Sequence, residues 1–236
     1  YLHGGPGGAA LEHLDQADFR ALFSELRAEA DVILLDQRGC GASKPSLVPE
    51  RQDRLRESTL ESRASFLDHL LGVASRVRVK LEKEGHDPRN FDIVQSAEDI
   101  GSVRLALGAP KLTLLAHSYG TQLAQEFARR HPDSVSRLVL ISSRGMDTSM
   151  KLPGQSETFL THIAERARTD ATVGAQFHDL LATLDRVLRK ADSAPIEVPV
   201  DDNATKTVST YRVGGFALRF IIAKFYLHAP DSTRYL

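Results

Sequence analysis

The chain has 236 residues, 42% of them hydrophobic and 26% charged, a balance typical of a globular protein with one large domain or one domain and an insert. The formal net charge is −1, which gives no sign of nucleic acid or a membrane surface as a partner. No apolar run approaches the roughly 20 residues of a membrane span. The single cysteine, Cys40, excludes an internal disulfide and fits a reducing compartment.

A glycine-rich loop, His3-Gly-Gly-Pro-Gly-Gly8, follows Tyr1 and Leu2, which have the character of a strand end. Its glycines permit positive φ angles and close approach of the backbone to a neighbour. After a strand, such a loop can direct a backbone N–H at a reacting oxygen, and Gly5 is the expected donor. The alternative is a flexible glycine-rich turn without this role.

The next elements alternate between helix and strand. Residues 17–30 predict an amphipathic helix, and the apolar run Val32–Leu35 predicts a strand covered on both sides. In the tight loop that follows, Asp36 and Arg38 could pair. Cys40, between two glycines and without an evident basic partner, is expected to be a small buried residue rather than a second nucleophile.

A charged stretch separates these elements from the centre of the chain. Residues 46–90 predict an insert with one long or two shorter surface helices, whose charge runs face solvent. Residues 91–107 predict another helix, which ends at Gly108-Ala-Pro110.

The central motif is a strand that turns abruptly into a helix. Thr113–Leu115 is a short apolar run, and helical spacing begins at Tyr119. Ser118 lies at the junction, within the small-x-Ser-x-Gly pattern of a nucleophile elbow that ends at Gly120. Ala116 stands where this pattern usually has glycine, a departure that lowers its specificity.

The elbow explains which atoms could react. A serine hydroxyl becomes a strong nucleophile only when a base takes its proton, and an elbow raises Ser118 to where a histidine can reach it. The Tyr119 N–H opens the helix without an intrahelical partner. Gly5 and Tyr119 are therefore the two expected donors of an oxyanion hole. An ordinary strand-to-helix turn is the alternative.

The alternation of strands and helices predicts an α/β core with a parallel sheet over residues 1–144. The alternation of strands and helices ends there. Residues 145–236 predict a mostly helical cap with a β-hairpin at about 196–213, whose turn is supplied by Asp and Asn. The elements expected after the elbow helix are a buried strand at 137–141, helices at 156–168, 173–190 and 216–227, and strands at 196–200 and 207–213.

Together these motifs resemble the α/β-hydrolase superfamily and, within it, the serine aminopeptidase family of proline iminopeptidases and tripeptidyl aminopeptidases. The hairpin and Gly214–Leu218 resemble the tripeptidyl aminopeptidase branch more weakly. The matching segments, in chain order, are His3–Gly7, Asp36–Gly39 with Gly41 and Ser43, Ala97–Ile100 with Arg104, Ser118–Gly120, Ala128–Pro132 and Arg137–Leu140.

This resemblance implies an α/β-hydrolase fold, with a mainly parallel sheet flanked by helices and a mostly helical cap. It also implies an acyl-enzyme on Ser118, formed from a short peptide with a free N-terminus, such as one that begins with proline, or from a small ester or amide. No metal or organic cofactor is expected, since the sequence has no clustered His/Cys ligands and its glycine loop lacks the Lys-Ser/Thr ending of a phosphate loop. Two other functions stay open: a capped esterase, and a non-catalytic binding protein without the triad base.

The triad acid and base follow the nucleophile in this fold and lie beyond the cap. We therefore expect them after Leu236, and we expect the chain to be an internal piece of a longer protein. His162, His178 and His228 follow Ser118 but fall within or at the end of cap-like helical patterns.

The remaining histidines have simpler expected roles. His3 orders its own loop, His117 packs, and His131 caps the end of a helix, where the partial negative charge favours it. An aminopeptidase also needs a carboxylate for the substrate ammonium group. The candidates are Glu157, Glu165 and Asp170, and the sequence does not choose among them or fix the oligomeric state.

Overall fold

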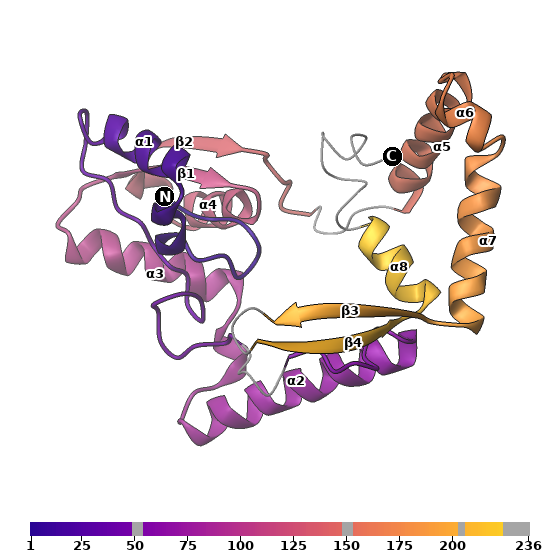
Figure 1. Ribbon diagram of the computed structural model, residues 1–236. Coiled ribbons are helices and arrows are strands. Elements are labelled where there is room, and N and C mark those ends of the chain that lie inside the picture. Colours follow the sequence, from indigo (N-terminus) through magenta and orange to yellow (C-terminus); the bar gives the residue numbers. More distant parts are fainter. Residues whose placement is uncertain (49–53, 148–152, 203–205, 224–236) are drawn as a thin grey trace. The chain divides into compact units, whose positions relative to one another are not determined.

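A computed structural model describes residues 1–48, 54–147, 153–202 and 206–223 (Figure 1). Contacts between residues divide the chain into two compact units. The N-terminal unit combines Tyr1–Pro49 with Val77–Met150, and the C-terminal unit combines Glu50–Arg76 with Lys151–Leu236.

The N-terminal unit contains a small parallel sheet. Strand β1 (Leu112–His117) pairs with β2 (Val135–Ile141) in parallel register, from Thr113 opposite Arg137 to His117 opposite Ile141. Leu2 adds single parallel bridges to Ala116 and to Leu35. The order Leu35, Leu2, β1, β2 confirms the predicted parallel α/β arrangement.

Two predicted strands differ from the structure. In Val32–Leu35 only Leu35 makes a bridge, to Leu2, and Ile33 is 37% exposed. Strand β2 was expected to be buried, yet Val139 and Ile141 are exposed. Among the described residues β2 has one strand partner, β1, and so one of its edges carries no neighbouring strand.

The helices that lie wholly within this unit, among its described residues, are α1 (Ala17–Leu26), α3 (Ile93–Ala106) and α4 (Tyr119–Arg130). Helix α4 packs against α3, β1 and β2, and Figure 1 shows it beside the two strands. Short 3-10 helices lie at Leu11–Asp15, Pro88–Asn90 and Pro132–Ser134. The core is apolar, since it is formed by the buried side chains of Leu2, Ala97, Ile100, Leu114, Ala116, Leu123, Ala124 and Phe127.

The C-terminal unit is mostly helical, with one hairpin. Strands β3 (Ile196–Asp202) and β4 (Thr207–Val213) pair antiparallel, Ile196 opposite Val213, at the residues where the sequence places a hairpin. The helix expected over 173–190 is two helices, because Asp179 accepts the Ala182 N–H at 2.9 Å and begins a new one. The elements that belong wholly to this unit are α5 (Pro153–Thr169), α6 (Val173–Gln176), α7 (Leu180–Ser193), β3 (Ile196–Asp202), β4 (Thr207–Val213) and α8 (Gly215–Ile221).

The division between the units passes through helix α2 (Arg63–Lys83), after Arg76. The chain before α2 bonds to β4 and the residue that follows it: the Arg212 N–H donates to the Glu57 carbonyl and the Gly214 N–H to the Leu60 carbonyl, both at 2.9 Å. Residues 50–76 thus group with the C-terminal unit, whereas the sequence assigned 46–90 as an insert of the core. No helix in the described ranges has both the length and the apolar character needed to cross a bilayer.

Candidate active site

Ser118 joins β1 to α4 in a strained backbone conformation, with φ 52° and ψ −118°. Such a conformation costs about 1–3 kcal/mol for a residue other than glycine and persists only where surrounding contacts enforce it. Here the Ser118 N–H donates to the Ile141 carbonyl at 2.9 Å, and the Ser118 carbonyl accepts the Thr121 N–H at 3.0 Å. The sharp strand-to-helix turn expected from the sequence is therefore present.

The small residues on both sides of Ser118 have a steric reason. A methyl group on Gly120 would lie 2.8 Å from the Leu2 carbonyl carbon and 2.9 Å from the His3 carbonyl oxygen. Ala116 is fully buried, and the core accommodates its methyl group in place of the glycine usual in this pattern.

The glycine loop passes directly beside the elbow. A Cβ atom on Gly4 would lie 2.9 Å from the Ser118 Cβ, so the loop backbone and the serine are in contact. Gly5 has φ 130° and is exposed, and a Cβ on it would lie 2.6 Å from the Gly7 nitrogen. The structure thus brings the glycine loop next to Ser118 and to Tyr119, the first residue of α4.

A cavity of about 310 Å³ lies beside this loop, at the low end of the size range of small-molecule sites. Its walls include Pro6, Gly7, Phe91 and the half-buried ring of Tyr119. Burial raises the pKa of the Tyr119 hydroxyl, with smaller contributions from nearby Cys40 and Asp92. The Tyr119 side chain is therefore neutral at physiological pH.

Cys40 forms part of the same wall. It is 8% exposed, and burial, followed by the charge of Asp36, raises the pKa of its thiol. A protonated, buried thiol is a poor nucleophile, which agrees with the packing role expected from the sequence.

Asp36 and Arg38, which could have paired with each other, have other partners. Arg38 donates two hydrogen bonds to Asp99 on α3, at 2.7 and 2.6 Å, and a planar guanidinium favours such two-point binding of a carboxylate. The buried Asp36 carboxylate instead accepts the N–H groups of Leu11 and Ala42 at 3.1 and 2.9 Å. Asp36 thereby fixes the loop through backbone donors.

Histidines cluster near the glycine loop. The ring centroids of His3 and His13 are 3.8 Å apart, and those of His3 and His117 are 5.9 Å apart. Burial lowers the pKa of His3, and repulsion from His13 and His117 lowers it further. Because the Tyr1 hydroxyl lies 2.8 Å from His3 Nδ1, His3 helps to order the start of the chain.

His117 points its partly buried ring toward the loop, since a Cβ on Gly4 would lie 3.4 Å from the His117 Nδ1. In the described part of the chain that nitrogen has no hydrogen-bond partner. None of the hydrogen bonds between described residues joins the Ser118 hydroxyl to a histidine. The base stays unassigned.

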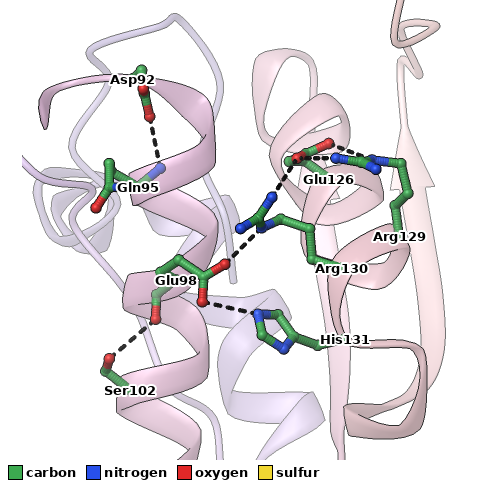
Figure 2. A network of polar contacts seen from close by, with 8 residues as sticks. All are labelled: Asp92, Gln95, Glu98, Ser102, Glu126, Arg129, Arg130 and His131. Carbon is green, nitrogen blue, oxygen red and sulfur yellow. Dashed lines mark hydrogen bonds and ion pairs between the residues drawn. The ribbon is translucent and has the colours of Figure 1, made fainter. Parts of the chain in front are cut away.

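The far end of α4 is held by an ion-pair network with α3 (Figure 2). Glu98 accepts from Arg130 at 2.6 Å and lies 3.0 Å from His131 Nε2, so the ring of His131 pairs with α3 while its backbone ends α4. Glu126, 5% exposed, accepts two bonds from Arg129 at 2.9 and 2.7 Å. Hydrogen bonds from the arginines lower the pKa of both glutamates.

The candidates of the C-terminal unit lie on its surface. His162, His178, Glu157 and Glu165 are exposed. Asp170 accepts the N–H groups of Thr172 and Val173, both at 2.9 Å, and these bonds lower its pKa.

His228 lies outside the described residues. Within the described ranges no group of three or more His, Cys, Asp or Glu side chains could hold a metal ion.

Comparison with known proteins agrees with this architecture. Residues 1–210 match the family described as the alpha/beta hydrolase fold. The chain belongs to this family.

Several curated relatives carry more specific names. Serine protease Hip1 of Mycobacterium tuberculosis is 30% identical over 146 residues, 58% of this chain and 27% of that protein. Tripeptidyl aminopeptidase of Streptomyces coelicolor is 27% identical over 154 residues, 60% of this chain and 27% of that protein. Proline iminopeptidase of Neisseria meningitidis is 27% identical over 193 residues, 75% of this chain and 47% of that protein. The chain therefore spans less than half the length of these relatives.

Proposed function

We propose that Ser118 is the nucleophile of a serine hydrolase, an aminopeptidase that releases N-terminal residues from short peptides. The observation that carries the proposal is the strained Ser118 at the β1–α4 junction, in contact with the glycine loop. Strain of this kind tends to be retained where it serves a mechanism. The names of the relatives support peptides as the substrate class.

In this mechanism the Ser118 oxygen forms a bond to the substrate carbonyl carbon while its proton passes to a base. The N–H groups of Gly5 and Tyr119 stabilise the negative charge on the carbonyl oxygen. The C–N bond then breaks, and the base returns the proton to the leaving amine. Water attacks the acyl-enzyme, releases the acid and restores the serine.

In the intact protein the base and the acid are residues that follow the cap, in the chain order of this fold. The proposed activity is therefore that of the full-length protein rather than of residues 1–236 alone.

The test compares the full-length wild type with Ser118→Ala and with Ser136→Ala, a matched change at an exposed serine on β2. A panel of aminoacyl and prolyl amides and short acyl esters is offered, and a fluorophosphonate reports on the reactive serine. We expect Ser118→Ala to lose labelling and at least about 10³-fold in kcat, and Ser136→Ala to keep both.

The substrate panel separates the alternatives. Turnover that requires a free amine supports the aminopeptidase, whereas a preference for acyl esters without an amine identifies an esterase. A folded full-length protein that neither labels nor turns over any substrate contradicts the proposal and favours a binding function.

A further inference from the structure

The first turns of α4 bind the chain segment that leaves β2. The Thr121 hydroxyl accepts the Arg144 N–H at 3.0 Å. The Gln122 amide donates to the Gly145 carbonyl at 2.9 Å, and the Gln125 amide donates to the Arg144 carbonyl at 2.8 Å. Three polar side chains of one helix thus hold residues 142–145, which we call the β2-exit segment.

The backbone N–H and the carbonyl of Ser118 are both tied to the end of β2 and the segment after it, the first directly and the second through Thr121. The Ser118 N–H donates to the carbonyl of Ile141, the last residue of β2. The Ser118 carbonyl accepts the Thr121 hydroxyl at 2.6 Å, in addition to the Thr121 N–H. Since that hydroxyl also accepts from Arg144, it bridges the elbow to a segment 23 residues away.

The bridge is well suited to fix a strained residue. A hydroxyl has one proton to donate, and here that proton serves the Ser118 carbonyl, while a lone pair accepts from Arg144. Thr121 is fully buried, so water does not reach it to replace either bond. A threonine that only bonded back to the carbonyl three residues earlier would be an ordinary helix feature; the second bond, to a distant segment, sets Thr121 apart.

We propose that Thr121 is a positioning residue for the nucleophile: its hydroxyl holds the Ser118 backbone in the strained elbow conformation and in register with the β2-exit segment. The inference rests on the proposed role of Ser118 and deepens it. It predicts that removal of the hydroxyl weakens reaction at Ser118 more than substrate binding, because a small displacement of a reacting atom costs rate.

The test uses three variants of the full-length protein. Thr121→Val removes the hydroxyl and keeps the shape, Thr121→Ser keeps the hydroxyl, and Thr113→Val makes the same change at an exposed position on β1. We expect Thr121→Val to lower kcat and the rate of fluorophosphonate labelling by about 10- to 100-fold with KM within about 2-fold. Thr121→Ser and Thr113→Val should stay within about 3-fold of the wild type. A folded Thr121→Val protein with wild-type kcat and labelling overturns the inference.

A second measurement does not depend on hydrolase activity. Amide hydrogen exchange of the peptide 116–122 reports on the Ser118 N–H, and we expect faster exchange in Thr121→Val than in Thr113→Val. If the wild type neither labels nor turns over substrate, the proposed function fails, while this exchange result still decides the role of Thr121. Equal exchange in the two variants contradicts it.

Thr121→Ala is the second variant, for the case that Thr121→Val does not fold. It removes both bonds of the hydroxyl without placing a second methyl group against the Ser118 carbonyl and the Arg144 N–H. We expect faster exchange at Ser118 there as well, and exchange equal to that of the wild type overturns the inference.

Discussion

Gly120 is the residue at which the elbow has the least room. Besides the Leu2 carbonyl carbon at 2.8 Å and the His3 oxygen at 2.9 Å, a methyl group there would collide with the Leu2 carbonyl oxygen. These are backbone atoms of the chain that runs into the glycine loop, so they cannot rotate away as a side chain would. Gly120 thus sets the distance between α4 and the start of the loop.

We predict that Gly120→Ala destabilises the protein by about 1–3 kcal/mol, the usual cost of overfilling a packed site. Gly101→Ala on α3 is the matched control, because its methyl group would meet Phe127 at an ordinary 3.6 Å. The control should stabilise by about 0.5–1 kcal/mol, since alanine is the better helix former. Urea unfolding measures both, and equal stabilities of the two variants would contradict the steric argument.

For single residues, the sequence predicts the local backbone geometry better than it predicts contacts with residues far along the chain. The pattern around Ser118 is a property of five consecutive residues, and the structure has the turn it indicates. Arg38 instead pairs with Asp99, 61 residues away, in preference to the near neighbour Asp36. Thr121 escaped the sequence analysis too, although a hydroxyl three residues after the serine was a visible signal; its second partner, Arg144, was not.

At the scale of elements, the α3–α4 network joins the helix that carries the elbow to its neighbour (Figure 2). Glu126 is its most buried member, while the Arg129 side chain is 64% exposed. Because solvent screens the exposed arginine, the pair stabilises the fold only modestly. A buried carboxylate with two charged hydrogen bonds still adds more stability than an ion pair between two exposed side chains.

We predict that Glu126→Gln lowers the free energy of unfolding by about 1 kcal/mol at neutral pH. The fold holds the pKa of Glu126 below its usual range, chiefly through the hydrogen bonds from Arg129. The carboxylate therefore contributes its full stability above the ordinary pKa of about 4.3, and the contribution is lost as the pH falls through the lower pKa of the folded state.

Urea unfolding at a series of pH values tests this, with Glu82→Gln, at an exposed i,i+4 pair on α2, as the control. The acidic decline of stability should be shallower in Glu126→Gln than in the wild type, and unchanged in Glu82→Gln. If the free energy of unfolding falls equally steeply with acid in Glu126→Gln and in the wild type, the stabilising role of the Glu126 carboxylate is contradicted. The fold lowers the pKa of Glu98 as well, so Glu98 should also contribute to the loss of stability at acidic pH.

The element predictions succeed where a segment carries its own pattern. β1 and α4 each have the expected periodicity, and the structure forms them. Val32–Leu35 has an apolar run as well, but only Leu35 makes a bridge, because strand pairing depends on a second segment that the pattern of a single segment does not report. The break before α7 was readable, since Asp179 three residues before Ala182 is a capping signal.

At the scale of the whole molecule, the C-terminal unit is built from two separate stretches of the chain. Arg212 forms an ion pair with Glu61 at 3.0 Å as well as its backbone bond to Glu57. The Phe66 ring packs on those of Phe216 and Phe220, at centroid distances of 5.8 and 5.4 Å. The sequence could not show these contacts, because they join residues about 150 positions apart.

We predict that a fragment of residues 145–236 unfolds without a cooperative transition, whereas a fragment in which residues 50–76 are linked to 151–236 unfolds cooperatively. The shorter fragment lacks the backbone partners of Arg212 and Gly214 and the ring that covers Phe216. Circular dichroism during thermal unfolding measures the difference. A sharp transition in the 145–236 fragment would show that residues 50–76 are dispensable.

The split composition of this unit also bears on how such proteins can diversify. A unit encoded by one uninterrupted stretch could pass between genes in a single recombination event. Here the hydrogen-bonded partners lie in two stretches, separated by the segment that carries Ser118. A hybrid that inherits residues 151–236 from one parent and 50–76 from another would join β4 to a foreign partner, so the two stretches should be exchanged together.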